Sequence, residues 1–432
     1  MERYEAYKDS GVEWIGEIPV GWKTARMGTS CYLKGRIGWQ GLKAEEFIDD
    51  GPYLVTGTDF CNGRVNWKTC YHISQDRFEE APEIHVRNGD LLITKDGTIG
   101  KLALICDAPN AVSLNSHLLL MRPLDGQIDS RFLFWVLSGE EFSHYTDISQ
   151  SGTIMASLSQ DKIARFIYAL PSVVEQQAIA DYLDVKTAEI DGLVADCERE
   201  VELLQEYRKA VISEAVTKGL DPNAPMKDSG VGWIGEIPEG WQVRSFKGVG
   251  QVVANLQRPQ DHLGLVQVAP DRIEKGTGRL WPCVTVEEAG VESDNHLFAT
   301  GDILYSKVRP ALNKVTVATF DGMCSADIYP IKTSENAHWL MYYMLSSAFV
   351  GQVVVSTDRV KMPKINKEEL GVFKVILPPL VEQQAIVSYL DAKTAEIDSL
   401  IDSKRQMIEK LREYRKSLIS EAVTGKFKVP GV

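Results

Sequence analysis

The sequence of 432 residues has few of the residues that would mark a metal site or a disulfide framework. Its seven cysteines are an odd number, no C-x-x-C pair occurs, and no Cys/His cluster has the spacing of zinc ligands. The seven histidines show no triad and no ligand order. We therefore expect buried free thiols in a reducing cytoplasm, with no metal ion and no catalytic residue in this chain.

Long apolar runs are also scarce. Residues 1–20 have no apolar core flanked by basic residues, so a secretory signal peptide is not expected. The stretch 339–357 contains nineteen uncharged residues, but Ser346, Gly351 and Gln352 interrupt it. It predicts a buried helix followed by a strand rather than a membrane segment.

Catalytic motifs are incomplete. In Gly97-Thr-Ile-Gly100-Lys101 only two residues separate the glycines, and Leu102 stands where a phosphate loop needs Ser or Thr, so a turn is predicted. Neither a G-x-G-x-x-G in a Rossmann context nor an Asn-Pro-Pro-aromatic tetrapeptide occurs, which leaves no visible S-adenosylmethionine pocket. Asp90 and Asp302 each follow a glycine. A metal nuclease would need a second carboxylate nearby, and none is placed there, so the Gly-Asp pairs are more typical of turns.

The chain has fewer basic than acidic residues and a net charge of −13, but this imbalance differs from one segment to another. Residues 23–169 hold 15 basic and 18 acidic residues, and residues 242–376 hold 15 basic and 14 acidic ones. Residues 170–241 alone carry a net charge of −9. Two nearly neutral segments can therefore present local basic faces, which permits DNA binding without demonstrating it.

The sequence contains a tandem duplication. The segment 170–219 begins LPSVVEQQAIADYLDVKTAEIDGL, and residues 377–426 repeat it at an offset of 207 without insertion or deletion. A second repeat, KDSGVEWIGEIPVGW at 8–22, returns at 227–241 with thirteen of fifteen positions identical. We interpret its residues Trp14, Trp22, Trp233 and Trp241 as packing residues.

Each copy of the longer repeat predicts one long helix, because apolar residues recur every seven positions beside a companion seam. Ser172 with Glu175 forms a capping box, and Gly219 and Gly425 stand where a C-terminal glycine cap belongs. We favour an intramolecular pair of the two helices over a homodimeric coiled coil. The stripes are Leu183, Ile190, Cys197, Leu204 and Val211, then Leu390, Ile397, Lys404, Leu411 and Leu418.

Between the repeats lie two dissimilar modules, residues 23–169 (module 1) and 242–376 (module 2). They share a skeleton of a Gly-Asp turn, a short apolar strand and a lysine, followed by a helix-like segment. The predicted fold class is α+β, with two mixed α/β modules separated by two long antiparallel helices in a pseudo-twofold tandem duplication. The predicted order is a repeat segment (1–22), module 1, a helix (170–219), a linker with the second repeat segment (220–241), module 2, a helix (377–425) and a tail (426–432).

Loops rich in Arg, Lys, Asn, Gln and Ser are the candidate DNA contacts, because these side chains pair with base edges and reach phosphates. For any one residue, an ordinary solvated loop is the main alternative. The candidates in module 1 are Lys34, Arg36, Gln40, Arg64, Lys95, Thr98, Lys101 and Asn115. Those in module 2 are Arg258, Arg279, Lys307, Arg309, Asn313, Lys314, Arg359 and Lys361.

Over nearly its whole length the chain resembles the specificity subunits of type I restriction–modification systems. The resemblance rests on S-G-V-x-W-I-G-E-I-P-x-x-W at 10–22 and 229–241, and on P-x-x-E-Q-Q-A-I with K-T-A-E-I-D in both copies of the long repeat. Lys404 is a departure, because it replaces Cys197 in the stripe. Burying its charge would be costly, so we expect it at a solvated or partner-facing edge.

The resemblance implies that each module is a target recognition domain that reads one half of a bipartite, asymmetric site in double-stranded DNA. It implies that the helices act as a spacer and bind two adenine-specific methyltransferase subunits, joined by restriction subunits with an ATP-driven translocase and nuclease. S-adenosylmethionine, ATP and Mg²⁺ would belong to these partners, no membrane would be involved, and the chain would be non-catalytic by itself. The alternatives are a protein scaffold that binds no nucleic acid and an enzyme with a cryptic nuclease site.

Overall fold

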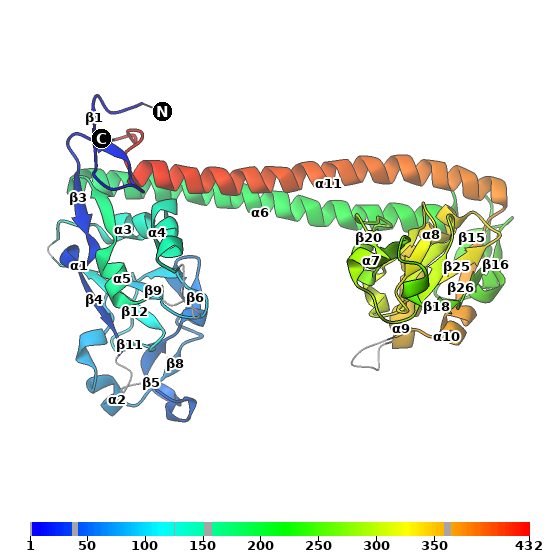
Figure 1. Ribbon diagram of the computed structural model, residues 1–432, viewed down its shortest axis with the longest axis horizontal. Coiled ribbons are helices and arrows are strands. Elements are labelled where there is room, and N and C mark those ends of the chain that lie inside the picture. Colours follow the sequence, from blue (N-terminus) through cyan, green and yellow to red (C-terminus); the bar gives the residue numbers. More distant parts are fainter. Residues whose placement is uncertain (1, 37–41, 125, 151–157, 358–363) are drawn as a thin grey trace. The chain divides into compact units, whose positions relative to one another are not determined.

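The computed structural model describes residues 2–36, 42–124, 126–150, 158–357 and 364–432. It divides into two compact units: unit 1 is Met1–Cys197 with Met407–Val432, and unit 2 is Glu198–Gln406. Each unit contains one module and parts of both long helices, α6 (Val173–Lys218) and α11 (Leu380–Val423) (Figure 1). The mixed α/β fold class with long helices is confirmed.

The long helices pair antiparallel within each unit. In unit 1, Tyr182 contacts Phe427 and Asp191 pairs with Arg415 at 2.8 Å. In unit 2, Glu200 pairs with Lys404 and Arg208 with Asp398. The intramolecular pair is thus confirmed, and so is the solvated position of Lys404, whose side chain is 37% exposed.

Among the described residues of module 1, two sheets have more than two strands. The first is antiparallel and has the order β10 (Leu102–Leu104), β9 (Leu91–Thr94), β12 (Leu118–Pro123), β4 (Cys31–Gly35). The second has the order β11 (Val112–Leu114), β5 (Ile48–Val55), β8 (Tyr71–His72), with β11 parallel to β5. Apolar side chains from both sheets, including Leu92, Leu118 and Leu120, form one core between them.

Module 2 repeats this plan with more strands. Its first sheet has the order β17 (Gly250–Val252), β25 (Ile328–Thr333), β22 (Ile303–Ser306), β23 (Val315–Val317). Its second has the order β18 (Leu256–Gln257), β21 (Asn295–Phe298), β24 (Gly322–Cys324), β19 (Val266–Val268), β20 (Val284–Thr285). The strands predicted after the two Gly-Asp turns are β9 and β22.

Each module packs on the long helices through a helical hairpin and a two-stranded ribbon. In unit 1 these are α3 (Ser130–Ser138), α4 (Glu140–Gln150) and β3 (Lys23–Arg26) with β13 (Ile167–Leu170). In unit 2 they are α8 (Ala337–Leu345), α9 (Ser347–Thr357) and β16 (Gln242–Ser245) with β26 (Lys374–Leu377). Shorter helices are α1 (Met27–Ser30), α2 (Gln75–Glu79), α5 (Gln160–Arg165), α7 (Val286–Ala289) and α10 (Lys367–Val372).

The strand predicted within 339–357 is wrong, because the chain continues there as α9. The β-branched run Val353-Val354-Val355 favours a strand locally, but Phe349 and Val353, one helical turn apart, are both buried in the unit 2 core. Among the described residues no single helix is long and apolar enough to cross a membrane. Only the bent pair of α8 and α9 passes that test, by length and composition.

The short repeat forms a hairpin in each unit, β1 (Tyr7–Asp9) with β2 (Glu17–Pro19) and β14 (Met226–Asp228) with β15 (Glu236–Pro238). Trp22 and Trp241 are fully buried packing residues, as predicted, and donate to Glu175 and Glu382. The same prediction is wrong for Trp233, which is 52% exposed. Its counterpart Trp14 packs on Tyr145, whereas the equivalent position in α9 is Gln352.

Gly425 and Gly219 end the long helices in the left-handed region, with φ of +72° and +80°. A Cβ on Gly425 would lie 2.6 Å from Cδ of Pro19, whereas the nearest atom to one on Gly219 would be Cζ2 of Trp241, at 3.3 Å. Alanine costs about 1 kcal/mol at either position through the backbone. We expect Gly425→Ala to lose about 1–3 kcal/mol more than Gly219→Ala, because the ring of Pro19 must move. Urea unfolding of both variants measures the difference, and equal losses would contradict the clash.

Glu141, in the first turn of α4, is half-buried against α11, and its Oε2 atom is fully buried. Its Oε1 accepts a hydrogen bond from Ser420, while Oε2 has no partner among the described residues. Burial raises the pKa of this carboxyl above its ordinary value, because the charged form loses its hydration.

A raised folded-state pKa gives a contribution to stability that is complete below about pH 4.3 and is lost as the pH rises through the folded pKa. We therefore expect Glu141→Gln to stabilise unit 1 by about 1 kcal/mol at pH 8 and to change little at pH 4. Unfolding at the two pH values tests this, with exposed Glu140→Gln as the control. A gain confined to pH 4 would reverse the sign and contradict the burial argument.

Candidate nucleic-acid interface

The candidate interface begins at a turn that precedes one strand in each module. Asp90 Oδ2 accepts a hydrogen bond from the backbone N–H of Arg87 at 2.6 Å, and Asp302 Oδ2 accepts one from Ala299 at 2.9 Å. Asp90 also binds Arg122 at 2.6 Å. The turn prediction is confirmed, and these carboxylates serve structure within the modules.

The strands that follow end at Lys95 and Lys307, which occupy equivalent places. The N–H of Lys95 donates to His117 O at 2.8 Å, and its carbonyl accepts from Leu158 at 2.9 Å. The N–H of Lys307 donates to Asp327 O at 2.9 Å, and its carbonyl accepts from Ile365 at 3.0 Å. Two dissimilar modules thus build the same junction of a strand end, a turn and a returning segment.

In module 1 this junction gathers five of the predicted contacts. Thr98 and Lys101 are exposed on the β9–β10 loop, and Lys95 and Asn115 are half-buried beside them. The β9–β10 loop contacts the neighbouring turn, since His117 Nδ1 lies 3.4 Å from Asp96 Oδ2. Lys34 of β4 lies opposite Leu120 of β12 in the sheet. The next residue, Gly35, is close to Lys95, because a Cβ on Gly35 would lie 3.1 Å from Lys95 Nζ.

Two other candidates in module 1 take no part in this exposed group. Arg36 is 4% exposed and donates to Leu114 O at 2.9 Å and to Ser113 Oγ at 2.8 Å, and burial lowers its pKa. A guanidinium used in this way reaches a phosphate only if the module opens. Arg64 is exposed near Cys106, at the other end of β10. Gln40 lies outside the described residues.

In module 2 the junction holds Lys307 and Arg309. Lys307 Nζ lies 5.1 Å from the ring centre of Tyr329, and Arg309 is exposed with φ of +47°. Lys314 donates to Pro270 O at 2.6 Å, so its charge is partly engaged. Arg258 is exposed on a separate loop after β18, and Arg359 and Lys361 lie outside the described residues.

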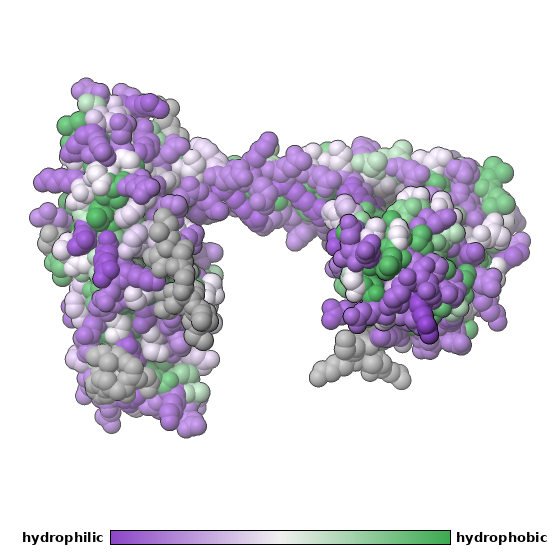
Figure 2. Space-filling model, viewed as in Figure 1, coloured by the Kyte–Doolittle hydropathy of each residue, from purple (hydrophilic) through white to green (hydrophobic). Residues whose placement is uncertain are grey.

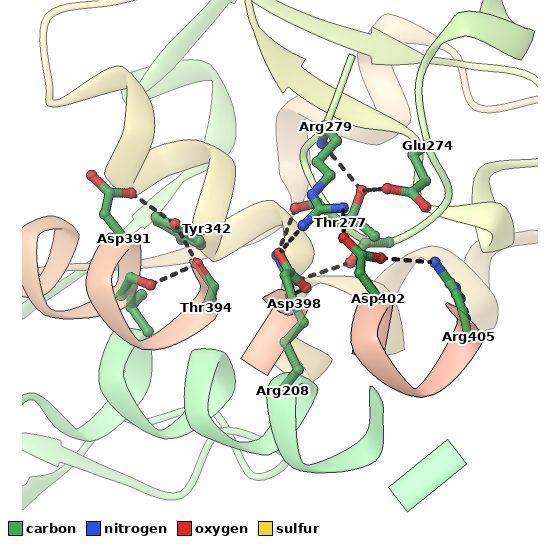
Figure 3. A network of polar contacts seen from close by, with 12 residues as sticks. Arg208, Glu274, Thr277, Arg279, Tyr342, Asp391, Thr394, Asp398, Asp402 and Arg405 are labelled. Carbon is green, nitrogen blue, oxygen red and sulfur yellow. Dashed lines mark hydrogen bonds and ion pairs between the residues drawn. The ribbon is translucent and has the colours of Figure 1, made fainter. Parts of the chain in front are cut away.

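Arg279 lies instead where module 2 meets the long helices (Figure 3). Asn313 lines the same region. Arg279 is paired with Asp398 at 3.2 Å and with Asp402 at 3.6 Å. Asn313 is 7% exposed, and its carbonyl accepts from Gly276. Composition alone did not separate these residues from the loop residues around Lys307.

His296 was not among the predicted contacts. It is 4% exposed, and its Nδ1 has no partner among the described residues. Burial lowers the pKa of this imidazole, and the positive charges of Lys307 and Lys367 lower it further. No spacing pattern in the sequence marks this buried histidine.

A second feature that sequence reasoning missed is a pair of exposed aromatic clusters on the long helices. In unit 1, Glu189 pairs with Lys186 at 2.7 Å and is the main cause that raises the pKa of this lysine. The phenol groups of Tyr182 and Tyr414 lie nearby and raise the same pKa further. In unit 2, Tyr389 and Tyr207 act in the same way on Lys393, which pairs with Glu396 at 2.8 Å.

The residues of the two clusters correspond at the offset of 207. Tyr207, Tyr389 and Tyr414 are 42–50% exposed, and scattered apolar side chains are visible among the hydrophilic ones that cover the helices (Figure 2). The signal was available in the sequence: these residues are identical in both copies but lie off the apolar stripe.

A family model described as the type I restriction modification DNA specificity domain matches residues 19–201 and 238–410. The chain belongs to this family. Each match covers one module with most of the long helix that follows it, so the chain contains two tandem specificity domains.

Relatives match over nearly the full length of the chain. The type I restriction enzyme EcoDI specificity subunit of Escherichia coli is 29% identical over 95% of this chain and 89% of its own. The putative MjaX specificity subunit of Methanocaldococcus jannaschii is 25% identical over 96% of both. A chain from a solved structure on the assembly and conformational transition of a type I R-M system shares the fold, with a TM-score of 0.71 at 16% identity, over 94% of this chain and 98% of its own.

Proposed function

We propose that this chain is the DNA-recognition subunit of a type I restriction–modification complex. Module 1 and module 2 would each read one half of a bipartite, asymmetric site, and the chain would act in the cytoplasm without catalysing a reaction itself. The observation that carries the proposal is the shared junction at Lys95 and Lys307. A duplicated frame there presents loops of different sequence, as expected of two modules that read different bases.

The loops around the junction supply two kinds of contact. Lys95, Lys101 and Lys307 provide positive charge for phosphates, and their neighbours Thr98 and Asn115 provide groups that hydrogen-bond base edges. Arg279 is excluded from this proposed face because Asp398 and Asp402 already bind it.

Docking of partners is proposed for the two aromatic clusters, Tyr182–Lys186–Tyr414 and Tyr389–Lys393–Tyr207. Tyrosines are enriched at interface centres, and two equivalent clusters fit two copies of one partner. That partner would be the methyltransferase subunit, and restriction subunits would join the assembly. S-adenosylmethionine, ATP and Mg²⁺ would be bound by these partners.

Methylome sequencing of the host with and without this chain tests the function. A bipartite methyladenine motif should disappear when the gene is deleted and return with the wild-type gene. Replacing residues 23–169 by a module from another family member should change one half-site only. An unchanged methylome after deletion would contradict the proposal and favour a scaffold that binds no nucleic acid.

A further inference from the structure

The two modules differ in the length of one hairpin turn that packs against the first helix of the helical hairpin, α3 in module 1 and α8 in module 2. In module 1, β6 (Phe60–Cys61) and β7 (Arg64–Val65) are joined by the two-residue turn Asn62-Gly63, with φ of +48° and +72°. In module 2 the bridge between Ile273 and Leu280 encloses a six-residue loop, 274–279. The longer loop provides module 2 with additional residues at this position, which have no counterpart in module 1.

The two hairpins are structural counterparts. A Cβ on Gly63 would lie 2.7 Å from Phe134 of α3, and one on Gly278 would lie 3.1 Å from Met341 of α8. Phe134 and Met341 correspond at the offset of 207. Both glycines also have positive φ, so the comparison is between one turn and its extended version.

The extended loop forms a polar cluster with both long helices, which we call the module 2 latch: Arg208, Arg279, Asp398, Asp402 and the carbonyls of Gly276 and Thr277. Arg208 of α6 pairs with Asp398 of α11 at 3.0 Å and donates to Thr277 O at 2.8 Å and to Gly276 O at 3.4 Å. Arg279 returns from the loop to bind Asp398 and Asp402 (Figure 3).

The loop of the latch is also held internally. Thr277 Oγ1 donates to Glu274 at 2.9 Å and accepts from the N–H of Arg279 at 3.1 Å. Asp398 and Arg208 have side chains only 12% and 6% exposed. Charge-assisted hydrogen bonds at such a site are directional, so they fix the loop in one position.

The counterpart in unit 1 has a different character. Asp191 and Arg415, which correspond to Asp398 and Arg208, form an ion pair whose side chains are 56% and 32% exposed. Arg415 lies 6.0 Å from the ring centre of Trp135, and the Asn62-Gly63 turn ends against Phe134. Among the described residues no loop of module 1 binds this ion pair. The polar contacts of module 1 with α6 are made by helix α3 instead, where Arg131 pairs with Asp181 at 2.7 Å and Trp135 donates to Asp184 at 2.8 Å.

We propose that the latch is a positioning device that fixes module 2 on the long helices and so sets where its reading loops meet DNA. Arg279 is the positioning residue, since it joins the loop to two carboxylates of α11. The consequence for DNA rests on the proposed function. Module 1 lacks this loop, and α3 and α4 make polar contacts with the long helices at other positions, such as Arg131 with Asp181 and Glu141 with Ser420.

The test uses the full chain with Arg279→Ala, Arg279→Lys as the conservative variant and Arg272→Ala as the matched control. Arg272 lies in the same module, pairs with its neighbour Asp271 at 3.8 Å and donates to Pro282 O, and the structure records no bond from it to α6 or α11 among the described residues. In hydrogen exchange of the purified chain, Arg279→Ala should speed exchange in residues 274–279 about tenfold, while Arg272→Ala should not.

The second readout is the methylome of cells that carry each variant with the host's own methyltransferase. Arg279→Ala should extend methylation to sites whose gap is one base pair longer or shorter, and Arg279→Lys should restore the wild-type gap. A change in stability alone would lower methylation at all sites without changing the gap. Faster exchange with an unchanged gap, or exchange at the wild-type rate, would overturn the positioning role.

The two readouts separate this inference from the proposed function. If the wild-type chain directs no bipartite methylation, the proposed function fails. The exchange rates of residues 274–279 then still decide whether the latch holds module 2.

Discussion

Inserting four residues into both long helices should lengthen the unspecified gap of the methylated site by about two base pairs and leave both half-sites unchanged. Four residues add about 6 Å to an α-helix, and B-DNA rises about 3.4 Å per base pair. Insertions after Cys197 in α6 and after Gln406 in α11 fall between the two units and leave the contacts within each unit in place. Methylome sequencing reads the gap directly.

The insertion also adds rotation, which sets an expected cost. Four residues turn a helix by about 400°, which leaves about 40°, whereas two base pairs rotate DNA by about 70°. Methylation at the new gap should therefore be weaker than for the wild type. An insertion of equal length in the linker 219–227 is the control, because it lies after α6. If the gap stays at its original length after the helix insertion but changes after the linker insertion, the long helices do not set the distance between the half-sites.

Asp398→Ala should destabilise unit 2 by about 3–5 kcal/mol, the usual cost of leaving one partner of a buried ion pair unpaired. Arg208, with a side chain 6% exposed, would keep only the carbonyls of Gly276 and Thr277 as acceptors. The corresponding change Asp191→Ala should cost less than about 1 kcal/mol, because its pair with Arg415 is largely exposed. Urea unfolding, with hydrogen exchange to resolve the two units, measures both losses.

The double variant Arg208→Met with Asp398→Leu separates the charge from the packing. Apolar residues of similar size often replace a buried ion pair with little loss, so the double variant should be more stable than Asp398→Ala. Equal losses from Asp398→Ala and Asp191→Ala would mean that Arg208 is solvated in solution, which would contradict its burial.

Much of the fold outside the two modules was predictable because the short repeat and the long helix each occur twice in the sequence. The offset of 207 and the heptad stripe predicted two helices that begin near Ser172 and Pro379 and pair within the chain. Local signals of this kind are reliable, because a capping residue or an apolar stripe favours the same local structure in most tertiary contexts. The prediction failed at α9, where burial of Phe349 and Val353 overrode the β-propensity of a valine run.

The candidate DNA contacts stay a prediction, but the structure shows where they lie. Lys95 and Lys307 lie at equivalent strand ends, as the shared Gly-Asp skeleton suggested, and Thr98, Lys101 and Asn115 lie on loops beside Lys95. Arg36 and Arg279 had the same composition-based support, yet one is buried in module 1 and the other binds α11. An arginine in a polar loop has the same local sequence whether it faces solvent or a carboxylate distant in the chain.

The sequence by itself therefore determined the duplication, the long helices, the two unlike modules and the resemblance that a family match then bore out. All of these depend on periodicity and repetition, which are properties of the chain. Only the tertiary structure decided which charges are used inside the protein. Arg208 and Asp398 are 190 residues apart, and the loop 274–279 meets them only after module 2 has packed on α6 and α11. Pairing over such separations depends on how the surfaces fit, and local sequence does not encode that fit.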